Sequence, residues 1–132
     1  MSNQINIRVY YEDTDAGGIV YYANYLKFAE RGRTEYLREK NLENSALMEQ
    51  NGVLFVVRHV AADYLYPARL DDMLRVETKI AEIKNASLIM TQSIFCHDRL
   101  LFKMDVVLAC VDLDGTLIKL PAIVKETLKN EI

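Results

Sequence analysis

The sequence predicts an α+β domain in which one long helix packs against an antiparallel sheet of about five strands. Three observations support this fold class. Residues 22–38 place apolar side chains at helical spacing, residues 74–111 alternate apolar and polar side chains, and short turn sequences separate the alternating runs. With 132 residues the chain is large enough to bury one core without disulfides or metals, so we predict a single domain over residues 1–132.

The first half of the chain predicts a strand, a loop and two helices. Apolar side chains alternate with polar ones over residues 5–11, which is typical of a half-buried strand. An acidic, glycine-containing loop follows, and the long helix is predicted to start at Tyr22. Gly32 lowers the stability of a helix by about 1 kcal/mol relative to Ala, so together with Ala29 it indicates close approach of the helix to a sheet. A second helix over residues 45–50 is predicted to end at Asn51-Gly52.

The second half of the chain predicts consecutive strands. Turn sequences at Asn85-Ala86 and Asp98-Arg99 separate runs of strand-forming residues. The predicted strands cover residues 53–57, 74–80, 87–97 and 100–111. Because the turns are short, neighbouring strands must run antiparallel, and the sheet is predicted to be a meander. Asp114-Gly115 predicts one more hairpin into residues 116–119. Pro121 is predicted to be the first residue of a short helix that carries Ile123, Val124 and Leu128.

Such an arrangement leaves part of the sheet uncovered. A single long helix covers only one face, so the other face and the edges stay open. Pairing of edge strands between two copies would extend the sheet, and we therefore predict self-association. A site near the seam between the copies would draw residues from both.

The composition disfavours several classes of protein. The chain has 16 basic and 19 acidic residues and a net charge of −3, which argues against nucleic-acid binding through phosphate neutralisation. The N-terminal residues lack an apolar signal region and the apolar runs are too short to span a bilayer. We therefore predict a cytoplasmic protein without stable membrane insertion. Cys96 and Cys110 lie in apolar runs without metal-ligand spacing, so buried free thiols are predicted, and no metal or cofactor.

Residues 10–25 form the candidate active site. They join the carboxylates Glu12, Asp13 and Asp15, the flexible Gly17-Gly18 pair and the start of the long helix. A carboxylate can attack an acyl carbon or activate water, and backbone N–H groups at a helix N-terminus can face a developing oxyanion. The same residues also fit a solvated acidic loop that interacts only with the helix dipole. Spacing alone leaves both interpretations open.

A family resemblance covers nearly the whole chain. The motif YEDTDAGGIVYYANYLKF at residues 11–28, continued by ER and RTE at residues 30–35, resembles hot-dog-fold acyl-CoA thioesterases of the 4-hydroxybenzoyl-CoA thioesterase family. It is most similar to the YbgC-type, Tol–Pal-associated branch. Residues 63–72 resemble the family segment that joins two central strands. The resemblance implies a long central helix wrapped by a curved, five- to six-stranded antiparallel sheet, assembled as a homodimer or homotetramer.

The resemblance also implies a reaction and its residues. The reaction is hydrolysis of acyl-CoA to a free acid and coenzyme A at the dimer seam. Asp15 matches the catalytic carboxylate, which acts as nucleophile on the thioester or as base for water. Tyr22 stands where a backbone N–H polarises the thioester carbonyl. The predicted substrate contacts are Tyr11, Gly18, Arg58 and His59.

Tyr22 departs from the YbgC pattern, in which the motif reads Val-Tyr-His-Ala-Asn-Tyr. The 4-hydroxybenzoyl-CoA branch has a tyrosine at this position, and a backbone donor survives the change, but any acid-base or positioning role of the histidine is lost. Two alternatives therefore stay open. One is a non-catalytic module that binds acyl thioesters. The other is a hot-dog thioesterase or dehydratase that acts on acyl carrier protein, although the dehydratase pattern of histidine and acid is absent here.

Overall fold

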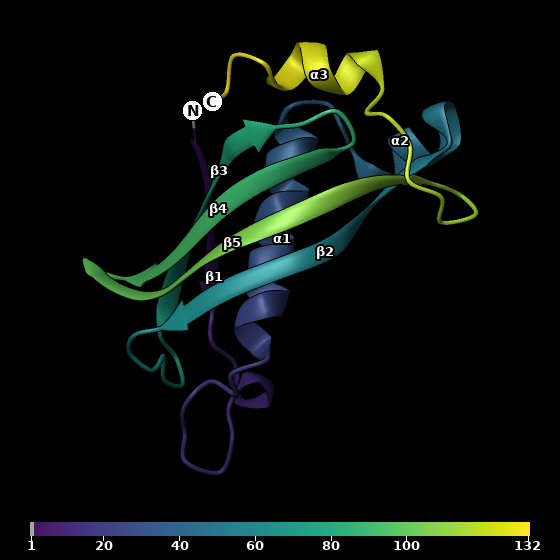
Figure 1. Cartoon of the computed structure of the whole chain (residues 1–132). Coiled ribbons are helices and arrows are strands. Elements are labelled where there is room, and N and C mark those ends of the chain that lie inside the picture. Colours follow the sequence, from purple (N-terminus) through teal and green to yellow (C-terminus); the bar gives the residue numbers. More distant parts are fainter. Residues whose placement is uncertain (1) are drawn as a thin grey trace.

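The computed structural model describes residues 2–132 and confirms the α+β class, with a five-stranded antiparallel sheet curved around one long helix (Figure 1). The strands are β1 (Ser2–Arg8), β2 (Val53–Tyr64), β3 (Met73–Ile83), β4 (Ser87–Cys96) and β5 (Arg99–Asp112). The helices are α1 (Asn24–Glu39), α2 (Asn44–Asn51) and α3 (Ala122–Leu128), and η1 (Tyr11–Asp13) is a single 3-10 turn. This architecture is the one that the family resemblance implied.

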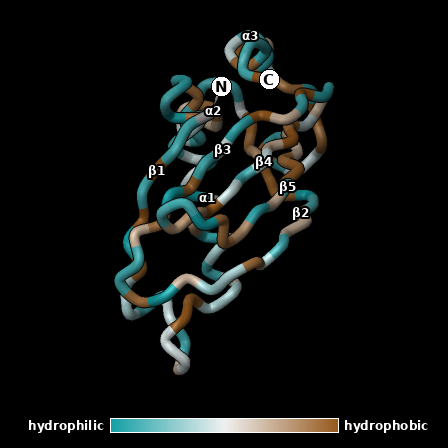
Figure 2. Tube along the Cα trace, turned by 90° about the vertical axis from the view of Figure 1, so that its left-hand side faces the viewer, coloured by the Kyte–Doolittle hydropathy of each residue, from teal (hydrophilic) through white to brown (hydrophobic). Residues whose placement is uncertain are grey.

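The strands lie in the order β1-β3-β4-β5-β2, and every neighbouring pair is antiparallel. The three strands from the second half of the chain form the predicted central meander. The two strands from the first half flank it, so β1 and β2 are the edges of the sheet as far as residues 2–132 are concerned. Hydrophobic residues gather on the central strands β4 and β5 (Figure 2).

Helix α1 crosses the concave face of the sheet and packs against β1 and β3. Gly32 allows this packing to be close, because a Cβ atom at this position would lie 2.8 Å from Val76 Cγ1 and 2.9 Å from Thr78 Oγ1. The close approach predicted from Ala29 and Gly32 is therefore confirmed. The buried side of α1 also includes Arg33, which helical spacing did not single out.

Two predictions near the start of the chain were wrong in detail. Strand β1 ends at Arg8, and Tyr11 belongs to η1 rather than to a strand. The cause is Asp13, whose Oδ2 accepts a hydrogen bond of 2.8 Å from the backbone N–H of Tyr10 and closes the turn. Helix α1 begins at Asn24 rather than Tyr22. Apolar spacing cannot distinguish the first helical residues from a turn that precedes them.

Two predictions near the end of the chain also need correction. The Asp114-Gly115 turn is present, and Gly115 has a φ of 85°, but residues 116–119 form only one isolated bridge, between Leu117 and Val111. Helix α3 starts at Ala122, so Pro121 caps it rather than beginning it, and Ile123 is exposed. Helix α3 instead uses Val124 and Leu128, both fully buried, to cover the core.

Candidate active site

The acidic loop between η1 and α1 folds into a small hairpin. Thr14 and Val20 form a bridge, and the N–H of Asp15 donates to the carbonyl of Ile19 at 2.9 Å. The N–H of Gly18 donates to the carbonyl of Asp15 at 3.0 Å, and Gly18 has a φ of 78°, which glycine adopts without strain. The hairpin therefore presents Asp15 at the first position of its turn.

The side chain of Asp15 is exposed and held by one hydrogen bond. Its Oδ1 accepts from the N–H of Gly17 at 2.8 Å, which is an Asx-turn contact. Among the described residues, no donor engages Oδ2. One oxygen thus fixes the carboxylate in the turn, and the other is available to a water molecule or an acyl carbon.

A second segment of the chain anchors the hairpin. The connection between β2 and β3 receives it through two backbone hydrogen bonds, from Val20 N–H to Ala68 O at 2.8 Å and from Leu70 N–H to Gly18 O at 3.4 Å. Ala68 is itself buried, and its N–H donates to the hydroxyl of Tyr25 on α1 at 2.9 Å. The loop is therefore fixed to both the sheet and the helix.

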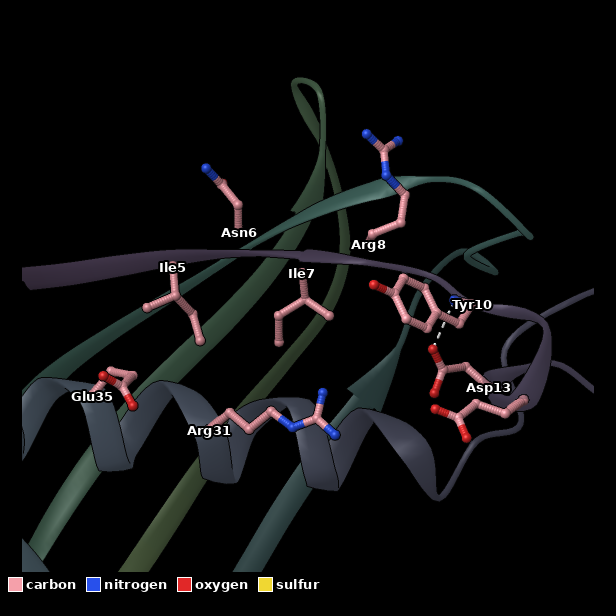
Figure 3. Close-up of a pocket in the computed structure, with 9 residues that line it drawn as sticks. Ile5, Asn6, Ile7, Arg8, Tyr10, Asp13, Arg31 and Glu35 are labelled. Carbon is pink, nitrogen blue, oxygen red and sulfur yellow. Dashed lines mark hydrogen bonds between the residues drawn. The ribbon is translucent and has the colours of Figure 1, made fainter.

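Asp13 has a structural role beside this loop. Its Oδ2 accepts from Tyr10 N–H (Figure 3), and its carbonyl accepts from Asn24 Nδ2 at 2.9 Å. Asn24, the first residue of α1, therefore braces this loop. Tyr10 and Asp13 border a hollow of about 540 Å³ between β1 and α1, into which Ile5 and Ile7 point from the strand (Figure 3).

The backbone of Tyr22 supplies the second part of the candidate site. In residues 2–132 its N–H forms no hydrogen bond, whereas its carbonyl accepts from the hydroxyl of Tyr64 at 3.1 Å. Helix α1 begins two residues later and extends over 16 residues. The N–H of Tyr22 therefore lies at the positive end of a long helix dipole and is available to an oxyanion.

An aromatic cavity of about 350 Å³ lies beside Tyr22. Tyr25 stacks on Phe102 with ring centroids 5.2 Å apart, and Tyr64 packs edge-on against both rings. Burial raises the pKa of Tyr25 and of Tyr64, so both hydroxyls stay protonated at neutral pH. The cavity walls include Ile19, Tyr22, Tyr25, Tyr64, Tyr66 and Pro67.

The structure does not bring all predicted site residues together. Tyr11 is 83% exposed on η1, and its carbonyl accepts from Thr14. Arg58 and His59 are exposed at a bulge in the edge strand β2. Five strand residues separate His59 from Tyr64, which is roughly 16 Å along the strand. In one copy of the chain, Arg58 and His59 are therefore remote from the Asp15 loop.

A buried polar network was missed in the sequence. Arg33 Nη1 donates to Gln92 Oε1 at 3.0 Å, and Gln92 Nε2 donates to the carbonyl of Ala29 at 2.7 Å and to Thr78 Oγ1 at 2.9 Å. Burial lowers the pKa of Arg33. A sequence signal for this network was present in β4, because the polar Gln92 stands at an inward position between the apolar residues Met90 and Ile94.

The described residues, 2–132, contain neither a cluster of metal ligands nor a membrane-spanning helix. Within residues 2–132, no group of three or more His, Cys, Asp and Glu side chains is arranged to hold a metal ion. No helix in the same range is long and apolar enough to cross a bilayer. Cys96 and Cys110 are free thiols, as predicted, although Cys96 is only half-buried.

Comparison with known proteins identifies the family. Residues 9–130 match the family described as the thioesterase-like superfamily. The chain is 50% identical over 107 residues to the acyl-CoA thioesterase YbgC of Haemophilus influenzae, which is 81% of this chain and 79% of that one. The acyl-CoA thioester hydrolase YbgC of Escherichia coli is also 50% identical over 107 residues, 80% of this chain and 79% of that one. The crystal structure of a probable thioesterase from Bartonella henselae has a TM-score of 0.89 at 35% identity and covers 92% of this chain and 100% of that one. The chain therefore belongs to the thioesterase-like superfamily and has its hot-dog fold.

Proposed function

We propose that the protein hydrolyses acyl-CoA thioesters to free acids and coenzyme A, with Asp15 and the backbone N–H of Tyr22 acting at the reacting carbonyl. One observation carries the proposal. A carboxylate with one unengaged oxygen and an unengaged N–H at the start of α1 belong to the same anchored loop, beside an aromatic cavity. The 50% identity to proteins named acyl-CoA thioesterases supports the substrate class.

The proposed chemistry uses groups of the chain alone. The N–H of Tyr22 donates to the thioester oxygen and stabilises the negative charge that develops there. Asp15 Oδ2 either attacks the carbonyl carbon, giving an anhydride that water then cleaves, or removes a proton from an attacking water. The thiol of coenzyme A has an ordinary pKa of about 8.5, so it leaves readily as a thiolate.

The aromatic cavity is the proposed site for the acyl group next to the thioester. Its volume of about 350 Å³ is at the lower end of the range for small-molecule sites. The rings of Tyr25, Tyr64 and Phe102 hold one another edge-on or stacked, so the wall is preformed. A thioester carbonyl beside Tyr22 would point its acyl chain along this wall.

We further propose a homodimer formed through the free edge of β2. Val56 and Val57 on this strand are 42% and 50% exposed, which is unusual for apolar residues in the middle of a long strand. A second copy on this edge would cover them, and it would bring Arg58 and His59 to a seam between copies. Light scattering should give twice the chain mass of 15.2 kDa, and a monomer at micromolar concentration would contradict the proposal.

The decisive experiment measures thiol release from acyl-CoA substrates by the native protein and by Asp15→Asn. The asparagine oxygen can still accept from Gly17 N–H, so the turn is kept while the charge is removed. Turnover is expected to fall about 100-fold or more. Asp105→Asn, an exposed carboxylate on β5, is the matched control and should be unchanged. Equal turnover in the native protein and in Asp15→Asn would refute the assigned mechanism.

The tyrosine at position 22 defines a second test. Tyr22→Phe keeps the backbone donor, so turnover is expected to stay within about threefold of native if the N–H is the important group. A large loss would assign the role to the hydroxyl instead.

Binding of acyl-CoA without turnover in the native protein would favour the non-catalytic module. Two predictions stay open to test. Use of acyl carrier protein would be tested by comparing hydrolysis of the same acyl group on coenzyme A and on the carrier protein. A homotetramer would be tested by the measured mass.

A further inference from the structure

Two separate cavities lie where α1 and β2 face each other. Because α1 packs on β1 and β3, it leaves the inward side chains Val60 and Ala62 of β2 only half-buried. β2 runs from α2, near the C-terminal end of α1, toward the N-terminal end of α1 (Figure 1). The aromatic cavity beside Tyr22 and Tyr64 is the one at the N-terminal end of α1, next to the Asp15 loop.

A second cavity, of about 450 Å³, lies between the middle of α1 and the first residues of β2. Its walls are mixed, with the apolar side chains Leu37, Phe55, Val57 and Leu108 beside polar groups of α1 and of the start of α2. Arg33 also lines it. Both cavities are therefore lined by residues of α1 and of β2, one at the N-terminal end of α1 and one beside the cation of Arg33.

The guanidinium of Arg33 is buried without an ion pair. Arg33 is only 8% exposed, and no carboxylate in residues 2–132 lies at ion-pair distance from it. Its one hydrogen-bond partner is Gln92 Oε1, which is fixed by its own contacts to α1 and β3. A buried cation of this kind is destabilising unless an anion or further acceptors reach it.

Among the other polar groups around this cavity, none in residues 2–132 forms an ion pair with Arg33, although the negative charge of Glu30 favours the charged guanidinium. Glu30 precedes Arg33 by one helical turn, is exposed to solvent and is beyond ion-pair distance. Thr34 and Asn44 are uncharged, and Asn44 is exposed. Among the described residues that line this cavity, Arg33 is thus the one buried charged side chain. The paired N–H donors of its guanidinium match the two oxygens of a carboxylate.

We propose that Arg33 binds a carboxylate at the remote end of the acyl group, so that mono-thioesters of dicarboxylic acids are favoured substrates. The inference rests on the proposed function, since it places the thioester at Tyr22. Helix α1 rises roughly 14 Å from Asn24 to Arg33, Tyr22 lies in the turn before it, and the Arg33 side chain leans back toward the N-terminus, which leaves about 12 Å to span. An extended chain advances about 1.2 Å per bond, so about ten bonds are needed.

The experiment compares kcat/KM for matched pairs of substrates. Sebacoyl-CoA and decanoyl-CoA have equally long chains and differ in the terminal carboxylate, and adipoyl-CoA and hexanoyl-CoA are the pair that is too short to reach Arg33. The native protein is expected to prefer sebacoyl-CoA over decanoyl-CoA by about 10- to 100-fold, and to show little preference in the short pair. Arg33→Met should abolish the preference. Arg38→Met, at an exposed position of the same helix, should keep it.

A binding measurement separates this inference from the proposed function. Titration calorimetry with Asp15→Asn should give tighter binding of sebacoyl-CoA than of decanoyl-CoA, whether or not the native protein turns over either substrate. Equal binding and equal hydrolysis of the two would overturn the inference and leave the thioesterase function intact. Arg33→Lys keeps the charge and should retain part of the preference if Arg33→Met fails to fold. An altered oligomeric state of Arg33→Met with an unchanged preference would assign Arg33 to a subunit contact and also overturn the inference.

Discussion

Gly32→Ala is expected to destabilise the protein, although alanine is the better helix former. In an exposed helix this exchange would gain about 1 kcal/mol. Here the new Cβ atom would lie 2.8 Å from Val76 Cγ1, 2.9 Å from Thr78 Oγ1 and 3.1 Å from Gln92 Nε2. All three neighbours are buried, so relief requires α1 to move away from the sheet.

The size of the effect follows from these contacts. Overpacking of a tight core costs about 1–3 kcal/mol, and weakening the hydrogen bond between Gln92 and Thr78 adds about 1 kcal/mol. After the gain in helix propensity, the net loss is about 1–3 kcal/mol. Unfolding a chain of this length has an entropy of about 0.28 kcal/mol/K, so Tm should fall by about 4–10 °C.

Thermal and urea unfolding of the native protein, Gly32→Ala, Val76→Ala and the double variant would measure this effect. Val76→Ala removes the atom closest to the new Cβ, so in that background Gly32→Ala should be less destabilising by about 1 kcal/mol or more. A higher Tm for Gly32→Ala alone would mean that helix propensity decides the outcome. The close packing inferred for α1 would then be wrong.

Three further predictions concern the core and its titration. Tyr25→Phe removes the acceptor of the buried Ala68 N–H and should lower the free energy of unfolding by about 1–3 kcal/mol in urea titrations, whereas an unchanged value would mean that water replaces the hydroxyl. Leu128→Ala should cost about 2–5 kcal/mol by the same assay, and a smaller loss would show that α3 contributes little to the core. Burial raises the pKa of Tyr36 and of Tyr64 in the folded protein above the ordinary 10.0. The stability that these neutral hydroxyls contribute is therefore fully present below about pH 10. It is lost as the pH rises from there through the raised pKa values of the folded state. Tm should therefore fall more steeply above about pH 10 in the native protein than in Tyr36→Phe, and equal slopes would contradict the raised pKa.

Local patterns predicted most of the fold. The period of apolar residues located α1, the turn sequences located the hairpins of the meander, and Gly32 indicated the close approach of α1 to the sheet. Each of these signals depends on residues that are near one another in the sequence. The family resemblance then supplied the curvature of the sheet around the helix, which spacing alone does not determine.

The details that were missed depend on contacts between distant residues or on side chains that bind their own backbone. Asp13 and Asp15 close turns by accepting backbone N–H groups, and these turns replace the end of a strand and the start of a helix. Arg33 and Gln92 are polar at inward positions and form a hydrogen bond with each other, and Gln92 also bonds to Ala29 and Thr78. Neither residue has a partner nearby in the sequence, so only the folded chain reveals the pair.

The strand order affects which part of the sheet unfolds first when the protein is destabilised. β1 leads into the Asp15 loop through η1, and within residues 2–132 its one partner strand is β3, where Arg8 lies opposite Met73. Edge strands open at lower free energy than central ones, so β1 can detach while the meander β3–β5 stays folded. Such sub-global opening would release one end of the loop that presents Asp15. We therefore expect the loop that presents Asp15 to lose its geometry at the sheet margin before the whole domain unfolds.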